Sequence, residues 1–411
     1  MKMTSKNAWW QKTIVLAVAL LVPGVSALAA TLAAKVSVTG TDNATTVATV
    51  LRQTAGPALE VATSPSNFGD LTLLVGGNPL PQANGVIIPA PNQMRYSAVG
   101  DRNMIEVPGE LTDTIPGGFP NGMWLSTTKV AGAGAEDNFN LSFVHFPFAD
   151  GWTAGHVSAT DGSLFAGNGA GATITPQFNL PTTNFGNGHY TVSVAGTDSR
   201  SSGMLFAAGG RNSGSGNVVP VGILPDGSGW DIRINDQGLN FPATEQANWS
   251  FVYVPYDAQN LMAGGQLSLG LDITVLNTVG TFTASRVDLG VNGSITPPTA
   301  PDGLNDAGRF LIQIPGQDDT TGILMIGVSK YATAGGLFGA DDNFLTYEYN
   351  SSLGGFLIET YDLTGATLQD SDVYFAFFRY DSPLAIPEPT TLWLGAMAFF
   401  ILGFARRRAA R

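Results

Sequence analysis

Hydrophobic and polar residues alternate in short runs along the middle of the chain, the pattern of half-buried β-strands. Gly, Asn, Asp and Ser fill the segments between the runs, as in 225–229, and this chemistry favours tight turns. No segment between the two termini keeps a helical period over ten residues. The pattern therefore predicts an all-β fold. The three clearest alternating runs are 103–109, 189–196 and 309–316.

Each of these runs begins one copy of an internal repeat. A strand that starts on glycine follows each run, and a strand rich in aromatic residues closes each copy. The second and third copies also share a middle hairpin, 229–232 and 355–358, which the first copy lacks. The glycine strands are 122–125, 203–206 and 322–325, and the aromatic strands are 141–148, 249–257 and 374–381.

The repeat predicts tandem β-sandwich-like units, because near-continuous apolar strands such as 251–256 are typical of strands covered on both faces. Residues 30–100 are expected either to form a partial unit or to pair with the first repeat. The predicted organisation is a signal peptide (1–29), an N-terminal β segment (30–100), repeat one (101–175), repeat two (189–296), repeat three (303–384) and a C-terminal sorting tail (385–411).

Composition supports a turn-rich β protein with a large core. The chain has 411 residues, of which 51 are Gly and 24 are Pro, and 44% are hydrophobic. Its acids are mostly Asp, which forms turns, rather than Glu, which favours helices. There is no cysteine, so the fold is stabilised by its core without disulfides.

Charge separates the ends of the chain from its middle. Residues 1–29 carry three lysines and residues 389–411 carry four arginines, and neither segment contains an acid. The remaining 12 cations face 32 acids, which gives the middle of the chain a charge of −20. An acidic body repels phosphates, so nucleic-acid binding is not expected.

The N-terminus has the parts of a secretory signal peptide. Lysines precede the apolar run 14–22, and small residues follow it up to Ala27-Leu28-Ala29, an A-x-A cleavage pattern. The apolar run is too short to span a bilayer as an uncleaved anchor. We therefore expect cleavage after Ala29 and export of the rest of the chain.

The C-terminus combines three features in a fixed order. Pro387-Glu388-Pro389 precedes the apolar run 392–405, and Arg406, Arg407 and Arg408 follow it. This segment resembles the PEP-CTERM sorting tail of exported bacterial proteins. The resemblance implies recognition by an exosortase, passage through the secretion machinery and transient or retained anchoring in the inner membrane. It also implies a final location at the cell surface or in the extracellular matrix.

The length and charge of the tail agree with that resemblance. Fourteen helical residues extend about 21 Å, and snorkelling arginines can make up the difference from a hydrocarbon core of about 30 Å. Positive charge at both ends of the chain predicts cytoplasmic termini and an external body. The body also resembles a recurrent module of PEP-CTERM proteins that has no defined activity.

Enzyme motifs are absent from the sequence. It contains neither a G-x-S-x-G nucleophile elbow nor a Walker A loop, and we expect no cofactor. His145 aligns with Tyr253 and Phe377 of the other copies, which predicts a packing position. We expect His189 to face solvent at the start of a strand and His156 to lie in a turn.

Weak calcium binding is the one metal hypothesis that the sequence supports. The near-identical segments 134–139 and 339–344 contain Asp137, Asp341 and Asp342, and calcium takes six to eight oxygen ligands from acidic loops of this kind. Neither segment has the spacing of an EF-hand loop, and a hydrogen-bonded turn is the alternative interpretation.

Together these features predict a non-enzymatic exported protein with a structural or adhesive role in an exopolysaccharide or biofilm layer. A carbohydrate-binding or ice-binding module is the alternative, although the body lacks the regular T-x-T ladders of ice binders. A secreted glycan hydrolase is the third possibility, because 32 acids supply many carboxylate pairs.

Overall fold

The described part of the protein is built almost entirely from antiparallel β-strands. This computed structural model describes residues 31–39, 46–54, 56–64, 69–92, 103–108, 122–129, 139–169, 171–177, 188–210, 217–236, 247–259, 261–269, 273–289, 295–296, 308–329, 343–362, 368 and 370–381. Within these ranges the helical segments are two single turns of 3₁₀ helix, η1 (Gln82–Asn84) and η2 (Phe148–Asp150). The prediction of an all-β fold is confirmed.

The first module is formed by the strands between residues 32 and 147. They pair into two four-stranded sheets, β2-β1-β9-β6 and β3-β4-β8-β7, with the short β5 added beside β4. The strands are β1 (Leu32–Thr39), β2 (Val47–Gln53), β3 (Leu59–Thr63), β4 (Asp70–Val75), β5 (Asn78–Pro79), β6 (Gly85–Pro91), β7 (Asn103–Glu106), β8 (Trp124–Lys129) and β9 (Phe139–Pro147).

The second module, residues 154–255, repeats this arrangement. Its sheets are β11-β10-β19-β14 and β12-β13-β17-β16, and β15 and β18 form a small separate ribbon. The strands are β10 (Ala154–Val157), β11 (Leu164–Asn168), β12 (Ala172–Pro176), β13 (His189–Val194), β14 (Gly203–Gly209), β15 (Asn217–Val218), β16 (Val221–Ile223), β17 (Trp230–Arg233), β18 (Asn235–Asp236) and β19 (Trp249–Pro255).

The third module, residues 261–379, has the same strand order again. Its sheets are β21-β20-β29-β26 and β22-β25-β28-β27, with a ribbon of β23 and β24. The strands are β20 (Leu261–Leu269), β21 (Ile273–Gly280), β22 (Thr283–Arg286), β23 (Asp288–Leu289), β24 (Ile295–Thr296), β25 (Arg309–Gln313), β26 (Gly322–Ser329), β27 (Asn343–Asn350), β28 (Gly355–Asp362) and β29 (Asp372–Arg379).

Leaving out the two-residue strands, the described residues of every module form eight strands in the orders 2-1-8-5 and 3-4-7-6. The first strand always pairs with the last, so each module is closed by contacts between its two ends. This closure places the boundaries away from the predicted ones. Residues 30–100 pair with the predicted repeat one, rather than forming a partial unit of their own. The strands at 154–176 belong to the second module, and those at 261–286 belong to the third.

The first copy has not lost its middle hairpin, contrary to the sequence prediction. Residues 122–125 match the seventh strands, 229–232 and 355–358, because Leu71 pairs with Leu125 as Tyr190 pairs with Ile232. The glycine strand of the first module is β6, which starts at Gly85. In each module both the fifth and the seventh strand begin at or shortly after a glycine. The sequence comparison therefore matched the seventh strand of the first module to the fifth strands of the other two.

Large aromatic residues fill the space between the two sheets of a module. In the second module the rings of Trp230 and Tyr253 lie 5.5 Å apart, and in the third those of Phe356 and Phe377 lie 5.6 Å apart. Each contact joins the seventh strand of one sheet to the eighth strand of the other. The aromatic strand is central in its own sheet and covered on both faces, as predicted from its continuous apolar sequence.

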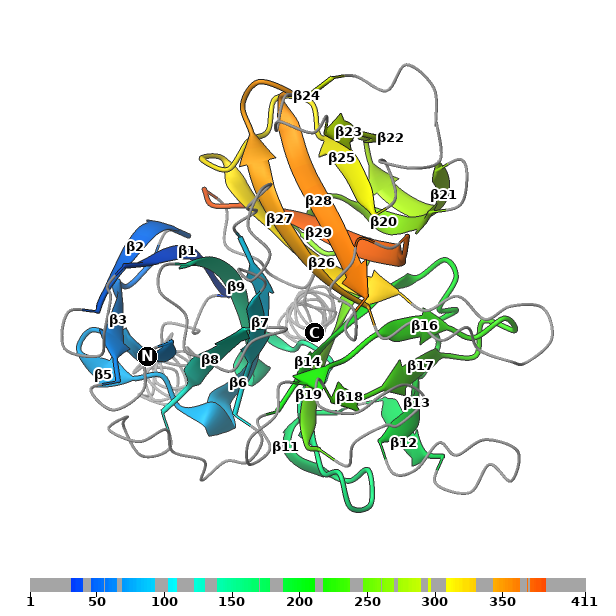
Figure 1. The fold of residues 1–411 in the computed structure, drawn as a ribbon. Helices are drawn as coiled ribbons and strands as arrows, with labels where there is room; N and C mark the ends of the chain where they lie inside the picture. Colours follow the sequence, from blue (N-terminus) through cyan, green and yellow to red (C-terminus); the bar gives the residue numbers. More distant parts are fainter. Residues whose placement is uncertain are drawn as a thin grey trace, which may run out of the picture.

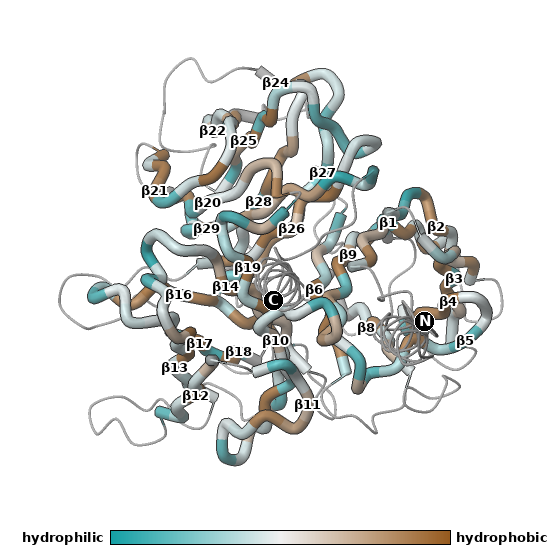
Figure 2. The backbone as a smooth tube through the Cα atoms, turned by 180° about the vertical axis from the view of Figure 1, so that it is seen from behind, coloured by the Kyte–Doolittle hydropathy of each residue, from teal (hydrophilic) through white to brown (hydrophobic). Residues whose placement is uncertain are grey.

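The three modules meet at their fifth strands and form three lobes around a common centre (Figure 1). Strands β6, β14 and β26 contact one another there, and hydrophobic residues run along β6 and β19 (Figure 2). A cavity of about 90 Å³ at this junction is lined by Ala90, Ala208 and Ile326 among others. The second strands, β2 and β21, lie at the periphery and carry exposed Val47, Leu51 and Val275.

Candidate functional site

Each module places a glycine at the start of its fifth strand under the side chain of a residue on the eighth strand. These glycines are Gly85, Gly203 and Gly322, and a Cβ atom at any of them would collide with His145, Tyr253 or Phe377, respectively. The three side chains occupy equivalent positions in the strand register. His145 is 2% exposed, so its predicted packing role is confirmed.

His156 connects the first two modules and does not lie in a turn as predicted. It is buried on β10, where Nδ1 lies 2.7 Å from Ser250 Oγ on the neighbouring strand. Its Nε2 lies 3.0 Å from the carbonyl oxygen of Gly85 and 3.2 Å from that of Gln82 in the first module. Two carbonyl acceptors place the proton on Nε2, so Nδ1 accepts from the serine. Burial lowers the pKa of His156, which keeps the ring neutral.

His189 is buried, so the prediction of a solvent-facing position was wrong. It is 2% exposed and pairs through Nε2 with Asp231 of the adjacent β17. The start of β13 lies inside a sheet rather than at its end, because β17 runs alongside it. Arg309 of the third module and Asp70 of the first occupy the position of His189, and each pairs with the residue directly opposite, Glu359 at 2.7 Å and Ser126, respectively. The residue opposite His189 is Arg233, so its partner Asp231 lies two positions further along β17. A different polar residue at this fourth-strand position in each module, paired each time with the neighbouring strand, indicates a structural role.

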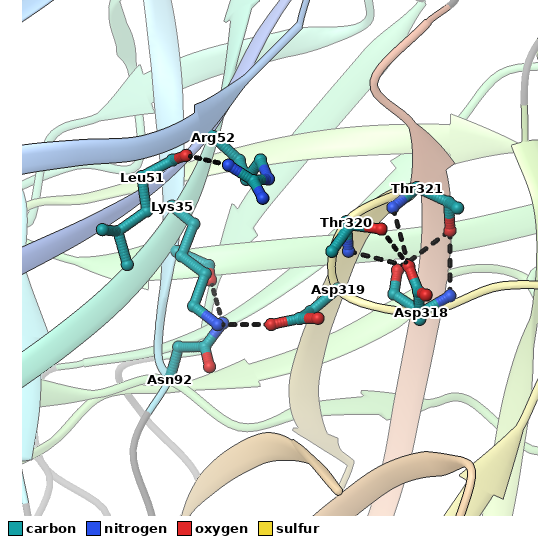
Figure 3. Close-up of polar contacts among 9 residues, drawn as sticks. Lys35, Leu51, Arg52, Asn92, Asp318, Asp319, Thr320 and Thr321 are labelled. Carbon is teal, nitrogen blue, oxygen red and sulfur yellow. Dashed lines mark hydrogen bonds and ion pairs between the residues drawn. The ribbon is translucent and has the colours of Figure 1, made fainter. Parts of the chain in front are cut away.

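An aspartate turn precedes the fifth strand in the second and third modules. Asp318 Oδ1 accepts hydrogen bonds from the Thr320 amide (2.9 Å), the Thr320 hydroxyl (2.7 Å) and the Thr321 amide (3.0 Å), as Figure 3 shows. These bonds, led by that of the Thr320 hydroxyl, lower the pKa of Asp318. All three end on Oδ1, and a side-chain hydrogen bond from Thr321 to the carboxylate lowers the pKa as well.

The neighbouring Asp319 serves a different purpose. Its carboxylate points away from this turn and pairs at 2.9 Å with Lys35 of the first module (Figure 3). The two adjacent aspartates therefore divide their roles, because Asp318 orders the turn and Asp319 joins the third module to the first.

A cleft of about 530 Å³ opens beside the Asp318 turn, at one end of the third module. Tyr349 contributes a partly exposed ring, supported from behind by Phe356 at a centroid distance of 5.2 Å. The Gln313 amide is held by Leu353 O at 2.8 Å and by the Thr283 hydroxyl at 3.3 Å. The polar and aromatic residues of its lining are Thr283, Gln313, Gln317, Asp318 and Tyr349.

The second module fills the corresponding space with an arginine. Arg200 Nε and Nη2 donate to the Asp198 carboxylate, at 3.0 and 2.7 Å, and Nη1 lies 3.4 Å from the carbonyl oxygen of Pro225. The arginine therefore lies between the aspartate turn and the hairpin that joins β16 to β17. Its hydrogen bonds lower the pKa of Asp198 to about 2. Thr320 is the equivalent residue in the third module, because both amides bond the aspartate Oδ1 at 2.9 Å.

The chemistry of the cleft suits binding. Its size lies in the range of small-molecule sites, and it combines one aromatic face with amides, a hydroxyl and a carboxylate. Among the residues that line it, Asp318 is the only acid, so the cleft does not offer the two carboxylates of a glycosidase. In the part of the chain that the structure covers, no group of three His, Cys, Asp or Glu residues could hold a metal ion.

The other predicted site residues lie outside the described ranges. These are the signal-peptide residues Ala27 and Ala29, the acids Asp137, Asp341 and Asp342, and the tail residues Pro387, Glu388, Pro389, Arg406, Arg407 and Arg408. Within those ranges no helix is long and apolar enough to cross a membrane. The cleft itself was missed, because it depends on which residue follows the turn in each module.

No protein-family model, curated protein or solved structure matches this chain.

Proposed function

We propose that the protein is an exported, non-enzymatic component of the cell surface or extracellular matrix, built from three tandem β-sandwich modules. The observation that carries this proposal is the tail, in which Pro387-Glu388-Pro389 precedes an apolar run and three arginines. An exosortase-type enzyme and the secretion machinery are its expected partners. The acidic charge of the body disfavours nucleic-acid partners.

The modular body supports a structural or adhesive role in an exopolysaccharide layer. Its buried histidines and ion pairs connect strands and modules, and none of them borders the cleft of the third module. Carbohydrate binding is the second candidate function, and the observation that favours it is this cleft, with its aromatic and amide side chains.

Localisation of the full chain in a bacterium that processes such tails tests the first proposal. We expect wild-type protein at the cell surface, with an intact mass that excludes the arginines at its C-terminus. A variant with Pro387→Ala, Glu388→Ala and Pro389→Ala should stay in the membrane fraction with Arg411 retained. Pro383→Ala, just outside the motif, is the matched control. Identical location and mass of the motif variant and the wild type would contradict the proposal.

Calcium binding by the loops that contain Asp137, Asp341 and Asp342 is a separate proposal, supported by their near-identical acidic sequences. Thermal unfolding with and without about 5 mM calcium tests it, since a ligand of the folded state raises the unfolding temperature. An unchanged unfolding temperature would contradict calcium binding by these loops.

A further inference from the structure

We propose that the cleft of the third module binds a neutral saccharide chain. This inference rests on the proposed function, because an exopolysaccharide layer would supply the ligand. It assigns recognition to one place in the molecule, formed by the Asp318 turn, the β25 end that carries Gln313, and Tyr349 near the end of β27.

The aromatic wall supplies the apolar part of the recognition. Tyr349 is only partly buried, and its ring is fixed against Phe356 at an interplanar angle of 66°. A ring fixed in this way loses little entropy on binding and presents an apolar surface with a polar tip. A sugar ring has an apolar face of C–H groups that fits such a surface, with hydroxyl groups around its edge.

The remaining lining side chains match those hydroxyl groups. A sugar hydroxyl both donates and accepts hydrogen bonds, so it needs acceptors and donors side by side. Asp318 contributes a carboxylate acceptor to the lining, and Gln313 contributes an amide with both a donor and an acceptor. The Gln313 side chain is held in place by its bonds to Leu353 and Thr283, so its position is set before a ligand arrives.

Charge favours a neutral ligand over an anionic one. Asp318 lines the cleft, Asp319 follows it in the sequence, and the body as a whole is strongly acidic. The nearby Lys35 is already paired with Asp319, and none of the lining residues is basic. A uronic-acid chain would therefore be repelled, whereas a neutral glucan or xylan would not.

The second module shows how the site is created. Its Arg200 crosses the same space and Ile223 stands where Tyr349 stands, because Ile223 pairs with Trp230 as Tyr349 pairs with Phe356. The third module has replaced the arginine by Thr320 and the isoleucine by an aromatic residue. These two differences open the space and line it with a ring.

Calorimetric titration of the full-length protein in detergent tests the proposal, with cellohexaose, laminarihexaose, maltohexaose and xylohexaose as probes and a galacturonate hexamer as the anionic comparison. We expect at least one neutral hexasaccharide to bind at a single site and the galacturonate to bind at least tenfold more weakly. Tyr349→Ala should weaken binding at least tenfold, and so should Thr320→Arg, which places the arginine of the second module in the cleft.

Ile223→Ala, at the matched position of the second module, is the control and should leave the affinity unchanged. Thermal unfolding of every variant separates lost binding from lost folding. The proposal is overturned if no neutral hexasaccharide binds at millimolar concentration, or if folded Tyr349→Ala and Thr320→Arg proteins both bind as well as the wild type. Surface location without saccharide binding would reject this site alone, whereas saccharide binding by a protein that stays inside the cell would reject the proposed function.

Discussion

The second and third modules share their strand order, their aspartate turn and their aromatic eighth strand, but the residue that follows the turn differs: the described part of the third module has a cleft there, and the second module has Arg200. In the second module Arg200 bonds Asp198 and approaches the hairpin carbonyl of Pro225. In the third module Thr320 bonds Asp318 and reaches no further. One side chain on a shared framework therefore decides whether the end of a module is closed or available to a ligand.

The framework itself is most sensitive at the aromatic residue above the fifth-strand glycine. Phe377 is fully buried between the sheets of the third module. Phe377→Ala should lower the free energy of unfolding by roughly 3–5 kcal/mol, the cost of a large cavity in a core. Denaturant unfolding measures this change.

Phe377→Tyr is the matched control, because the second module already carries Tyr253 there. The Tyr253 hydroxyl donates to the Ser202 carbonyl oxygen at 2.8 Å, and Thr321 occupies the position of Ser202. We expect the tyrosine variant to retain most of the stability of the wild type. Equal destabilisation by alanine and tyrosine would show that the two modules are not equivalent at this position.

The polar pair between the fourth and seventh strands should give the next largest effect. Glu359 is fully buried and accepts hydrogen bonds from both Arg309 and Tyr361. Arg309→Met would leave the buried Glu359 carboxylate without its cation. The free energy of unfolding should therefore fall by roughly 3 kcal/mol, in the lower part of the range for broken buried ion pairs. Denaturant unfolding of Arg309→Met and of the double variant with Glu359→Leu measures this.

The double variant should recover much of the loss, because replacing both partners removes the uncompensated charge. The second module has His189 and Arg233 at these two positions, and both lie beside Asp231, so the framework does not depend on one ion pair there. A double variant no more stable than Arg309→Met would mean that the ion pair itself stabilises the module.

The first module differs from the other two in having a histidine above its fifth-strand glycine, and this difference makes a prediction about pH. Burial lowers the pKa of His145 to about 3, with a contribution from the nearby His156. The unfolded chain, with an ordinary histidine pKa of about 6.5, therefore binds more protons than the folded chain between about pH 3 and pH 6.5. Stability should fall as the pH drops through that window and should be independent of this group above it.

His145→Phe, which installs the residue of the third module, should reduce this dependence. One histidine contributes at most about 1.4 kcal/mol per pH unit to the slope. Urea unfolding of the wild type and the variant between pH 4 and pH 7 measures the two slopes. Identical slopes would mean that His145 does not control the acid sensitivity of the first module.

The comparison of modules also explains what could be learned from the sequence. Alternation and aromatic strands predicted the fold class and the repeat, because they reflect local burial. The boundaries were wrong because the first strand of each module pairs with its last, and no local pattern records that pairing. His189 was misplaced for the same reason, since its burial depends on β17 rather than on its neighbours in the chain.

The cleft was equally hidden in the sequence. Thr320 and Arg200 are both ordinary turn residues, and only the structure shows that they occupy one position in two modules. Tyr349 belongs to an alternating strand, where an aromatic residue normally indicates packing. An alignment of the second and third modules that began at Asp198 and Asp318 would have shown the loss of the arginine as the one signal of an open site.

The smallest expected effect on stability, and the sharpest test of the comparison, comes from opening the second module. Arg200 and Asp198 form an exposed ion pair, and exposed pairs contribute little to stability. The variant Arg200→Thr with Ile223→Tyr should therefore unfold at nearly the wild-type temperature. It should also create a second cleft with a tyrosine wall, so that calorimetry with the hexasaccharide that binds the wild type gives two sites per chain in place of one.

Arg200→Lys is the control, because it keeps a long cation in the space and should keep one site. If the double variant folds and still binds at one site, the arginine is not what closes the second module. The next difference to exchange would then be on the fourth strands, where the second module has Ser193 and the third has Gln313.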